Sequence, residues 1–166
     1  MIDPVYCQTM ARYNRWQNNQ LADYLLALTE EELDRPRGAF FTSIRRTANH
    51  LLWADGTWMS RFDGGDRPMG GISESVTIQP DIQGWAVARS MMDDRIEDWC
   101  EDIDQDRLDG DLSWFSGALG ADVTKPLGLC VVHLFNHQTH HRGQIHAMLT
   151  ATGSKAPVTD LFILPD

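Results

Sequence analysis

Apolar residues recur every three to four positions in four long stretches of this chain, over about residues 9–28, 43–62, 81–104 and 127–149. This spacing matches the turn of an α-helix and predicts four amphipathic helices, each with one apolar face. Thr29 followed by three glutamates adds a short helix with a threonine cap and an acidic first turn. Because four such helices bury their apolar faces against one another, the pattern predicts an all-α four-helix bundle.

The segments between these helices differ in composition. Residues 64–80 are rich in Gly, Pro and Ser, and we expect a long loop that covers part of the body. Residues 109–125 contain short apolar stretches around Gly117 and Gly120, which favours a short β-hairpin before the last long helix. The tail contains the apolar run Leu161 to Leu164, and we therefore expect the tail to pack back onto the bundle rather than to extend into water.

Length and charge limit the class of protein. At 166 residues the chain is long enough for one real core, so we expect a single domain over residues 1–166. The net charge of −10 argues against nucleic acid as a partner. Much of the acidity lies in residues 30–34 and 93–111, which we interpret as solvated helix faces and loops. The absence of a membrane-length apolar run and of a signal-peptide pattern favours the cytoplasm and no membrane partner.

The last predicted helix carries five of the six histidines of the chain: His133, His137, His140, His141 and His146. On a helical wheel His137 and His141 border the apolar face, whereas His133 and His140 turn towards water and His146 lies at the back. Imidazoles four residues apart stack on one face of a helix and can bind the same divalent metal. His133 and His137 share that spacing and remain a competing pair, and any of the five could instead be an ordinary surface or core histidine.

A stable metal site needs a third ligand, since catalytic zinc-type sites usually have three protein ligands and an open position. His50 is the remaining histidine, and it lies beside the apolar face of the predicted helix over residues 43–62. If that helix neighbours the histidine-rich one, His50, His137 and His141 can converge. Gln138 stands where a zinc-protease helix needs its glutamate base, so this pattern excludes that class of protease. No Asp or Glu stands out as a general base, and the catalytic residues stay unknown.

Four segments together resemble the DinB family, also called DinB/YfiT-like. They are YNRWQNN from residue 13, TANHLLWAD around His50, NHQTHHRGQ from residue 136, and PVTDL from residue 157. Their order and spacing extend over nearly the whole chain. The resemblance implies an up-down-down-up four-helix bundle that binds a divalent metal, usually nickel or zinc. By motif position it implies the ligands His50, His137 and His141, and excludes His140. It also implies a homodimer.

The resemblance leaves the activity open between several classes. Characterised members of the family include transferases that join a low-molecular-weight thiol such as bacillithiol to an electrophile, and a mycothiol-dependent maleylpyruvate isomerase. Others are regarded as metal-dependent hydrolases. We therefore expect a metal-dependent enzyme acting on a small molecule, with thiol transfer ahead of hydrolysis by metal-activated water, and a non-enzymatic metal- or ligand-binding module as the alternative. Asn136 and Gln144 are candidates to hydrogen-bond and orient the imidazoles, or else they are surface amides.

Overall fold

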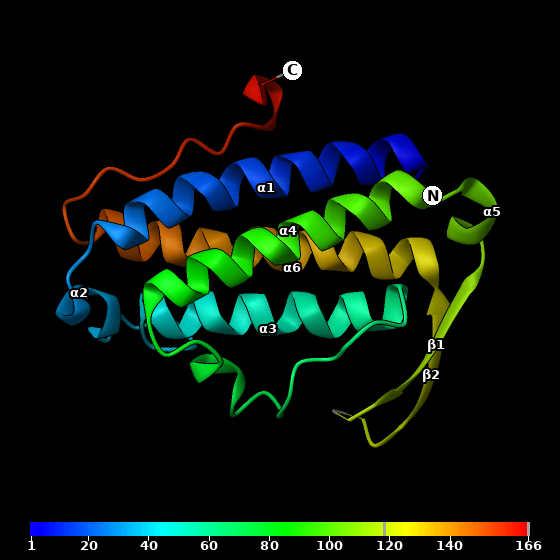
Figure 1. Cartoon of the computed structure of the whole chain (residues 1–166), viewed down its shortest axis with the longest axis horizontal. Helices are drawn as coiled ribbons and strands as arrows, with labels where there is room; N and C mark the ends of the chain where they lie inside the picture. The colour runs from blue at the N-terminus through cyan, green and yellow to red at the C-terminus, as the bar shows by residue number, and fades with distance from the viewer. Residues whose placement is uncertain (118, 166) are drawn as a thin grey trace.

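The computed structural model describes residues 1–117 and 119–165. Its body consists of four long helices: α1 (Pro4–Leu26), α3 (Ile44–Phe62), α4 (Ile82–Asp102) and α6 (Leu127–Thr150). In Figure 1 α1 and α6 run in one direction and α3 and α4 in the other. This arrangement confirms the expected up-down-down-up bundle. The long connection between α3 and α4 returns the chain to the end where α3 began, which lets these two helices run parallel.

Side-chain caps fix where three of the long helices begin. The side chains of Asp3, Ser43 and Asp81 each accept a hydrogen bond from a backbone N–H in the first turn that follows. Such caps satisfy donors that have no partner within the helix. The first helix therefore begins at Pro4 rather than near Thr9, because a capping aspartate followed by proline at the first helical position is a strong start signal.

Shorter elements connect the long helices. The predicted short helix is α2 (Glu30–Asp34), and the predicted hairpin consists of β1 (Asp111–Ser116) and β2 (Ala121–Pro126) in antiparallel pairing. The loop between α3 and α4 contains a 3₁₀ turn, η1 (Ser75–Thr77). The helix α5 (Gln105–Leu108) has only four residues, which is too short to give a recognisable hydrophobic period. A second 3₁₀ turn, η2 (Leu161–Ile163), lies near the end of the chain.

Two apolar clusters form the core, one towards each end of the bundle, with buried polar side chains between them. One cluster contains Trp99 and Phe135, and the other contains Leu25 and Trp85. The polar side chains between them come from all four long helices and form what we call the polar layer: Asn14, Asn18, Asp55, Arg89, Asp93, Gln138 and Arg142. The interpretation of residues 93–111 as solvated is wrong at Asp93, whose exposed fraction is 1%.

Ion pairs and hydrogen bonds connect the members of the polar layer. Arg89 donates to Asp55 at 2.5 Å and contacts Asp93 at 2.8 Å. The side-chain amides of Asn14 and Asn18 each donate to Asp93 at 2.9 Å, and Arg142 donates to Asn14. Gln138 of α6 donates to Asp55 of α3 at 3.1 Å. Buried charges are tolerated when they are paired in this way, and the layer joins the four helices at mid-height.

The tail is held along α1 by its backbone. Tyr13 donates to the carbonyl of Thr159 at 2.6 Å, and Gln17 donates to the carbonyl of Val158 at 2.7 Å. The expectation that the tail packs back onto the bundle is confirmed by these contacts and by the hydrogen bond from Arg12 to the carbonyl of Pro165 at 2.8 Å. Polar contacts with carbonyls hold the segment, whereas the side chain of Phe162 is 86% exposed. Across the described residues, we find no helix that combines the length and the apolarity needed to span a bilayer.

Candidate metal centre

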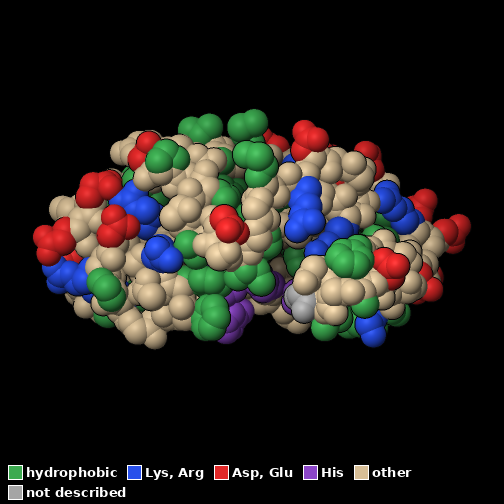
Figure 2. Space-filling model, turned by 90° about the horizontal axis from the view of Figure 1, so that it is seen from below, with side chains coloured by type: hydrophobic (Ala, Val, Ile, Leu, Met, Phe, Trp, Pro, Cys, Tyr) green, Lys and Arg blue, Asp and Glu red, His purple; other side chains and the backbone are tan. Residues whose placement is uncertain are grey.

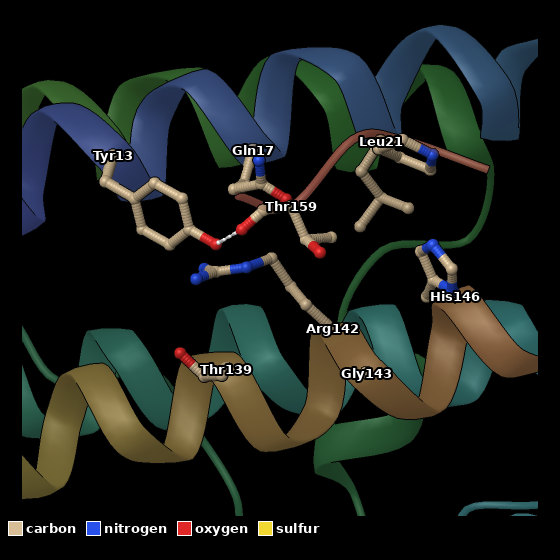
Figure 3. A pocket seen from close by; sticks show the side chains of 9 residues that line it. Tyr13, Gln17, Leu21, Thr139, Arg142, Gly143, His146 and Thr159 are labelled. Atoms are coloured by element: carbon tan, nitrogen blue, oxygen red, sulfur yellow. Dashed lines mark hydrogen bonds between the residues drawn. The ribbon is translucent and has the colours of Figure 1, made fainter. Parts of the chain in front are cut away.

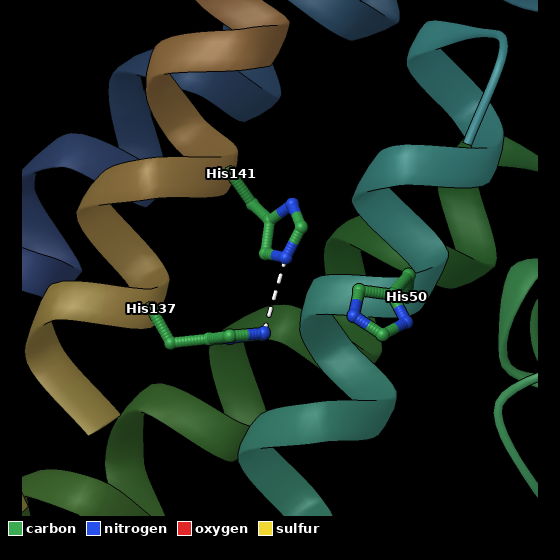
Figure 4. A group of neighbouring side chains, drawn as sticks. All are labelled: His50, His137 and His141. Atoms are coloured by element: carbon green, nitrogen blue, oxygen red, sulfur yellow. Dashed lines mark hydrogen bonds between the residues drawn. The ribbon is translucent and has the colours of Figure 1, made fainter. Parts of the chain in front are cut away.

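Three histidines from two neighbouring helices meet at one point (Figure 4). His50 comes from α3, whereas His137 and His141 lie one turn apart on α6. One ring nitrogen from each lies within 4.8 Å of the other two, and the Nε2 atoms of His137 and His141 are 3.0 Å apart. His50 and His141 are buried and His137 is half-buried. The structure thus brings together the three histidines that the sequence indicated.

The loop between α3 and α4 orients His50. The Nδ1 atom of His50 lies 2.9 Å from Oγ of Ser75, and that hydroxyl donates its own hydrogen to the carbonyl of Ile72 at 2.7 Å. Because the hydroxyl hydrogen is already used, Ser75 accepts a hydrogen bond from the Nδ1–H of His50. This leaves a lone pair on Nε2 of His50, as a metal ligand requires. The expected covering loop therefore lies against the site, although nothing in the sequence indicated Ser75.

Gln144 orients His141 in the same way. Its Oε1 lies 2.8 Å from Nδ1 of His141, and its amide nitrogen lies 3.1 Å from Nε2 of His140. The amide oxygen therefore accepts from the Nδ1–H of His141, which leaves a lone pair on Nε2. Asn136, the other predicted orienting amide, is exposed and makes no hydrogen bond to these imidazoles within the described part of the chain.

The environment of His137 fits a cation between the rings. Its Nδ1 atom is buried without a hydrogen-bond partner among the described residues, so this group is incompletely satisfied. Its Nε2 lies 3.0 Å from Nε2 of His141, a little closer than the separation of about 3.3 Å between nitrogen ligands of a tetrahedral zinc ion. Three neutral nitrogen donors at these separations suit a divalent ion such as zinc or nickel. A small outward rotation of either ring would accommodate the ion.

Burial keeps these imidazoles neutral. Desolvation, followed by the proximity of His141, lowers the pKa of His50 to about 4. Desolvation and the neighbouring histidines lower the pKa of His137 to about 3. Desolvation also lowers the pKa of His141. Since all three remain unprotonated at neutral pH, their lone pairs are available for a cation without any competition from protons.

The remaining histidines of α6 lie outside this group. The ring centroid of His133 is 5.8 Å from that of His137, and its ring packs on Trp58 at 4.9 Å. His140 is exposed beside Gln144. His146 lines a separate cavity of 210 Å³ between α1, α6 and the tail, together with Tyr13 and Arg142 (Figure 3). That cavity contains one imidazole and none of the three grouped histidines.

Phe41, in the connection between α2 and α3, covers one side of the three histidines. Its ring stacks on His50 with ring centroids 3.9 Å apart. The site also opens into a cavity of 640 Å³, which has His50, His137 and Trp53 in its wall. In Figure 2 histidine side chains reach the surface of this face beside hydrophobic ones. The site is therefore enclosed enough to lower the pKa of its imidazoles, yet accessible to a small molecule.

Comparisons with known proteins agree with this architecture. The model of the DinB family matches residues 1–166. The chain is 26% identical over 157 residues to Protein DinB of Bacillus subtilis (strain 168), which covers 89% of this chain and 87% of that protein. Its fold is similar to the crystal structure of a DinB-like protein from Bacillus cereus ATCC 10987, with a TM-score of 0.64, 19% sequence identity, and coverage of 86% of this chain and 90% of the other. The chain belongs to the DinB family.

Proposed function

We propose that this protein is a metal-dependent enzyme that transfers a low-molecular-weight thiol to an electrophilic small molecule. The observation that carries the proposal is the meeting of ring nitrogens from His50, His137 and His141 beside a cavity of 640 Å³ that has His50 and His137 in its wall. Three protein nitrogens would leave a bound divalent ion with a free position for a further ligand. Such an ion supplies positive charge that lowers the pKa of a thiol in contact with it.

The chain's own residues would hold and orient the reactants. Ser75 and Gln144 keep two of the imidazoles in the tautomer that leaves Nε2 without a hydrogen. Phe41 covers one side of His50, which restricts access of water from that side. In the reaction the thiol releases its proton to solvent, and its sulfur forms a bond to carbon of the electrophile. In a substitution the leaving group departs with the electron pair of the broken bond, and in an addition the π-electron pair moves onto the neighbouring atom, which takes up a proton from solvent.

The composition of the cavity wall favours thiol transfer over hydrolysis. A hydrolase that activates water commonly uses a carboxylate as a general base. The described residues that line the cavity include no Asp or Glu. Asp55, the carboxylate nearest to His50 along α3, is fully buried and already paired with Arg89 and Gln138. A thiol with a lowered pKa ionises without such a base, so the transferase reaction needs fewer groups from the chain.

Metal analysis and a thiol-transfer assay test this function. Metal-loaded protein is incubated with glutathione, bacillithiol or mycothiol and the model electrophile monochlorobimane, and conjugate formation is followed by fluorescence. We expect about one metal ion per chain and turnover with at least one thiol, and we expect both to be lost in His50→Ala. His140→Ala is the matched control and should retain both. Stoichiometric metal in His50→Ala would contradict the ligand assignment, whereas metal without turnover with any thiol would contradict the transferase reaction.

A homodimer remains part of the proposal on the strength of the family resemblance. The exposed apolar side chains of the tail, Leu161, Phe162 and Ile163, support it because such groups usually find a covering surface. Light scattering of the full chain would measure the mass directly. A mass of one chain at micromolar concentration would contradict this part and leave the metal site unaffected.

A further inference from the structure

The cavity beside the three histidines combines aromatic and basic walls. Its volume of 640 Å³ lies inside the range of about 300–1,000 Å³ typical of small-molecule sites. Trp53, Trp58 and Trp114 contribute flat apolar surface, and Arg61 and Arg67 contribute positive charge. No acidic side chain is among its described lining residues. In a chain whose net charge is −10, a cavity with only positive formal charges is a distinct local environment.

Stacking fixes the position of Arg61. The Cζ atom of Arg61 lies 4.4 Å from the ring centroid of Trp58 and 5.2 Å from that of Trp114. Trp58 comes from the same helix, α3, whereas Trp114 comes from the β-hairpin, so the guanidinium sits where helix and hairpin meet. Contacts with aromatic faces hold the plane of a guanidinium while leaving the N–H donors at its edge for another partner. Arg61 is therefore placed and still able to bind an anion.

Neither cavity arginine has an acidic partner in the part of the chain that the structure describes. Six other arginines of the chain form ion pairs with carboxylates: Arg15, Arg35, Arg37, Arg45, Arg89 and Arg95. Among the described residues, Arg61 and Arg67 form no ion pair and no hydrogen bond. Burial and the nearby charge of Arg67 lower the pKa of Arg61, so the charge of Arg61 is not compensated by the protein. An anion placed beside both guanidiniums would remove this repulsion.

A continuous row of side chains leads from the arginines to the metal centre. Arg61 lies on Trp58, Trp58 contacts His133 at 4.9 Å between ring centroids, and His133 lies 5.8 Å from His137. A ligand lying along this row has its anionic end at the arginines and its other end at the histidines. The row also gives a role to His133, which lies outside the three-histidine group but lines the cavity between Trp58 and His137.

We infer that this cavity binds an organic anion, with its charge at Arg61 and Arg67, its flat or apolar part against Trp58 and Trp114, and its reactive end at His50 and His137. This inference deepens the proposed function. It rests on that function in one respect only, namely that the reactive end of the ligand is a thiol or an electrophile. It assigns the charge and the shape of the molecule that occupies the cavity. A neutral molecule of the same shape would lack the contacts to the guanidiniums and bind more weakly.

Two fluorescent probes that differ in one charged group test this inference. The probes are 8-anilinonaphthalene-1-sulfonate and N-phenyl-1-naphthylamine, which share their ring system, and both are titrated into the metal-free full chain. Using metal-free protein prevents the sulfonate from binding the ion instead of the arginines. We expect the anionic probe to bind at least about fivefold more tightly than the neutral one at low salt. We expect Arg61→Gln and Arg67→Gln each to weaken the anionic probe about fivefold and leave the neutral probe unchanged.

Arg46→Gln is the matched control, because Arg46 is an exposed arginine on the same helix and lines a different cavity. It should bind both probes as the parent protein does. Equal affinity for the two probes, or an anionic probe that binds Arg61→Gln and Arg67→Gln as tightly as the parent, would overturn the inference. Arg67 is exposed, so Arg67→Gln stays informative if Arg61→Gln is destabilised. None of these titrations needs metal or turnover, so a failed thiol-transfer assay leaves this result interpretable.

Discussion

Two groups of buried polar side chains lie in the middle of the bundle, and they differ in how charge is distributed within them. In the polar layer two positive side chains, Arg89 and Arg142, balance two negative ones, Asp55 and Asp93, and side-chain amides add hydrogen bonds. At the three histidines no charged side chain among the described residues is paired with the imidazoles, whose ring nitrogens meet at one point. Opposite charges paired within one group indicate a structural role, whereas neutral nitrogen donors that converge without a charge between them indicate a binding site.

The largest effect should come from removing one charge of the polar layer. Asp55→Ala leaves the guanidinium of Arg89 buried beside a single carboxylate, and we expect it to lower the free energy of unfolding by about 3–5 kcal/mol. Urea denaturation followed by circular dichroism measures this change. His50→Ala, one turn away on the same helix, should cost clearly less in the metal-free protein. Equal losses in the two variants would abolish the distinction between structural and binding polar groups.

The next effect concerns metal affinity. His137→Ala removes an imidazole whose Nε2 lies 3.0 Å from Nε2 of His141. We expect the dissociation constant for zinc or nickel to rise by at least about 100-fold. Competition with a chromophoric chelator measures it. His133→Ala, the neighbouring histidine outside the group, should change the constant by less than about threefold. A loss in His133→Ala as large as that in His137→Ala would instead support the competing pair of His133 and His137 as ligands.

A smaller effect on the same constant should follow loss of an orienting group. Ser75→Ala removes the acceptor that holds the tautomer of His50, and we expect metal affinity to fall about tenfold. Ser73→Ala in the same loop is the matched control, since its hydroxyl donates to Glu74 instead. If both serine variants bind metal like the parent, the tautomer of His50 does not depend on Ser75.

A different kind of effect, on stability rather than on metal affinity, should be a pH dependence of the metal-free protein. The pKa of His50 is about 4 and that of His137 is about 3 in the folded chain, whereas the pKa of histidine in the unfolded chain is about 6.5. Between these values the unfolded state binds more protons, so stability falls as pH decreases from about 6.5 towards 4. Urea midpoints of the parent and of the double variant His50→Gln, His137→Gln should diverge in this range, with the parent steeper. Parallel curves would show that the imidazoles are not desolvated in the apo protein.

The sequence predicted the parts of this molecule that follow local rules. Helical period placed the four long helices, and the i, i+4 spacing of His137 and His141 with the boundary position of His50 selected the three histidines. Ser75 could not be predicted, because its role depends on how a loop 25 residues away in the chain folds back. Asp93 was misinterpreted because a carboxylate in an acidic segment looks solvated until its partners on α1 and on its own helix are known. The tail lies against the bundle as expected, but hydrogen bonds to its carbonyls hold it there and the side chain of Phe162 stays exposed.

The hydrogen bond between Ser75 and His50 would couple binding of an ion at the histidines to the position of a loop. The backbone around η1 keeps its position partly through this contact, and His50 keeps its tautomer through the same contact. By thermodynamic linkage, a ligand that prefers the oriented imidazole also stabilises the seated loop, and a motion that lifts the loop releases the ion more easily. Hydrogen exchange of the amides around Ser75 should therefore slow when metal is added, which makes this segment a reporter of occupancy that needs no knowledge of the substrate.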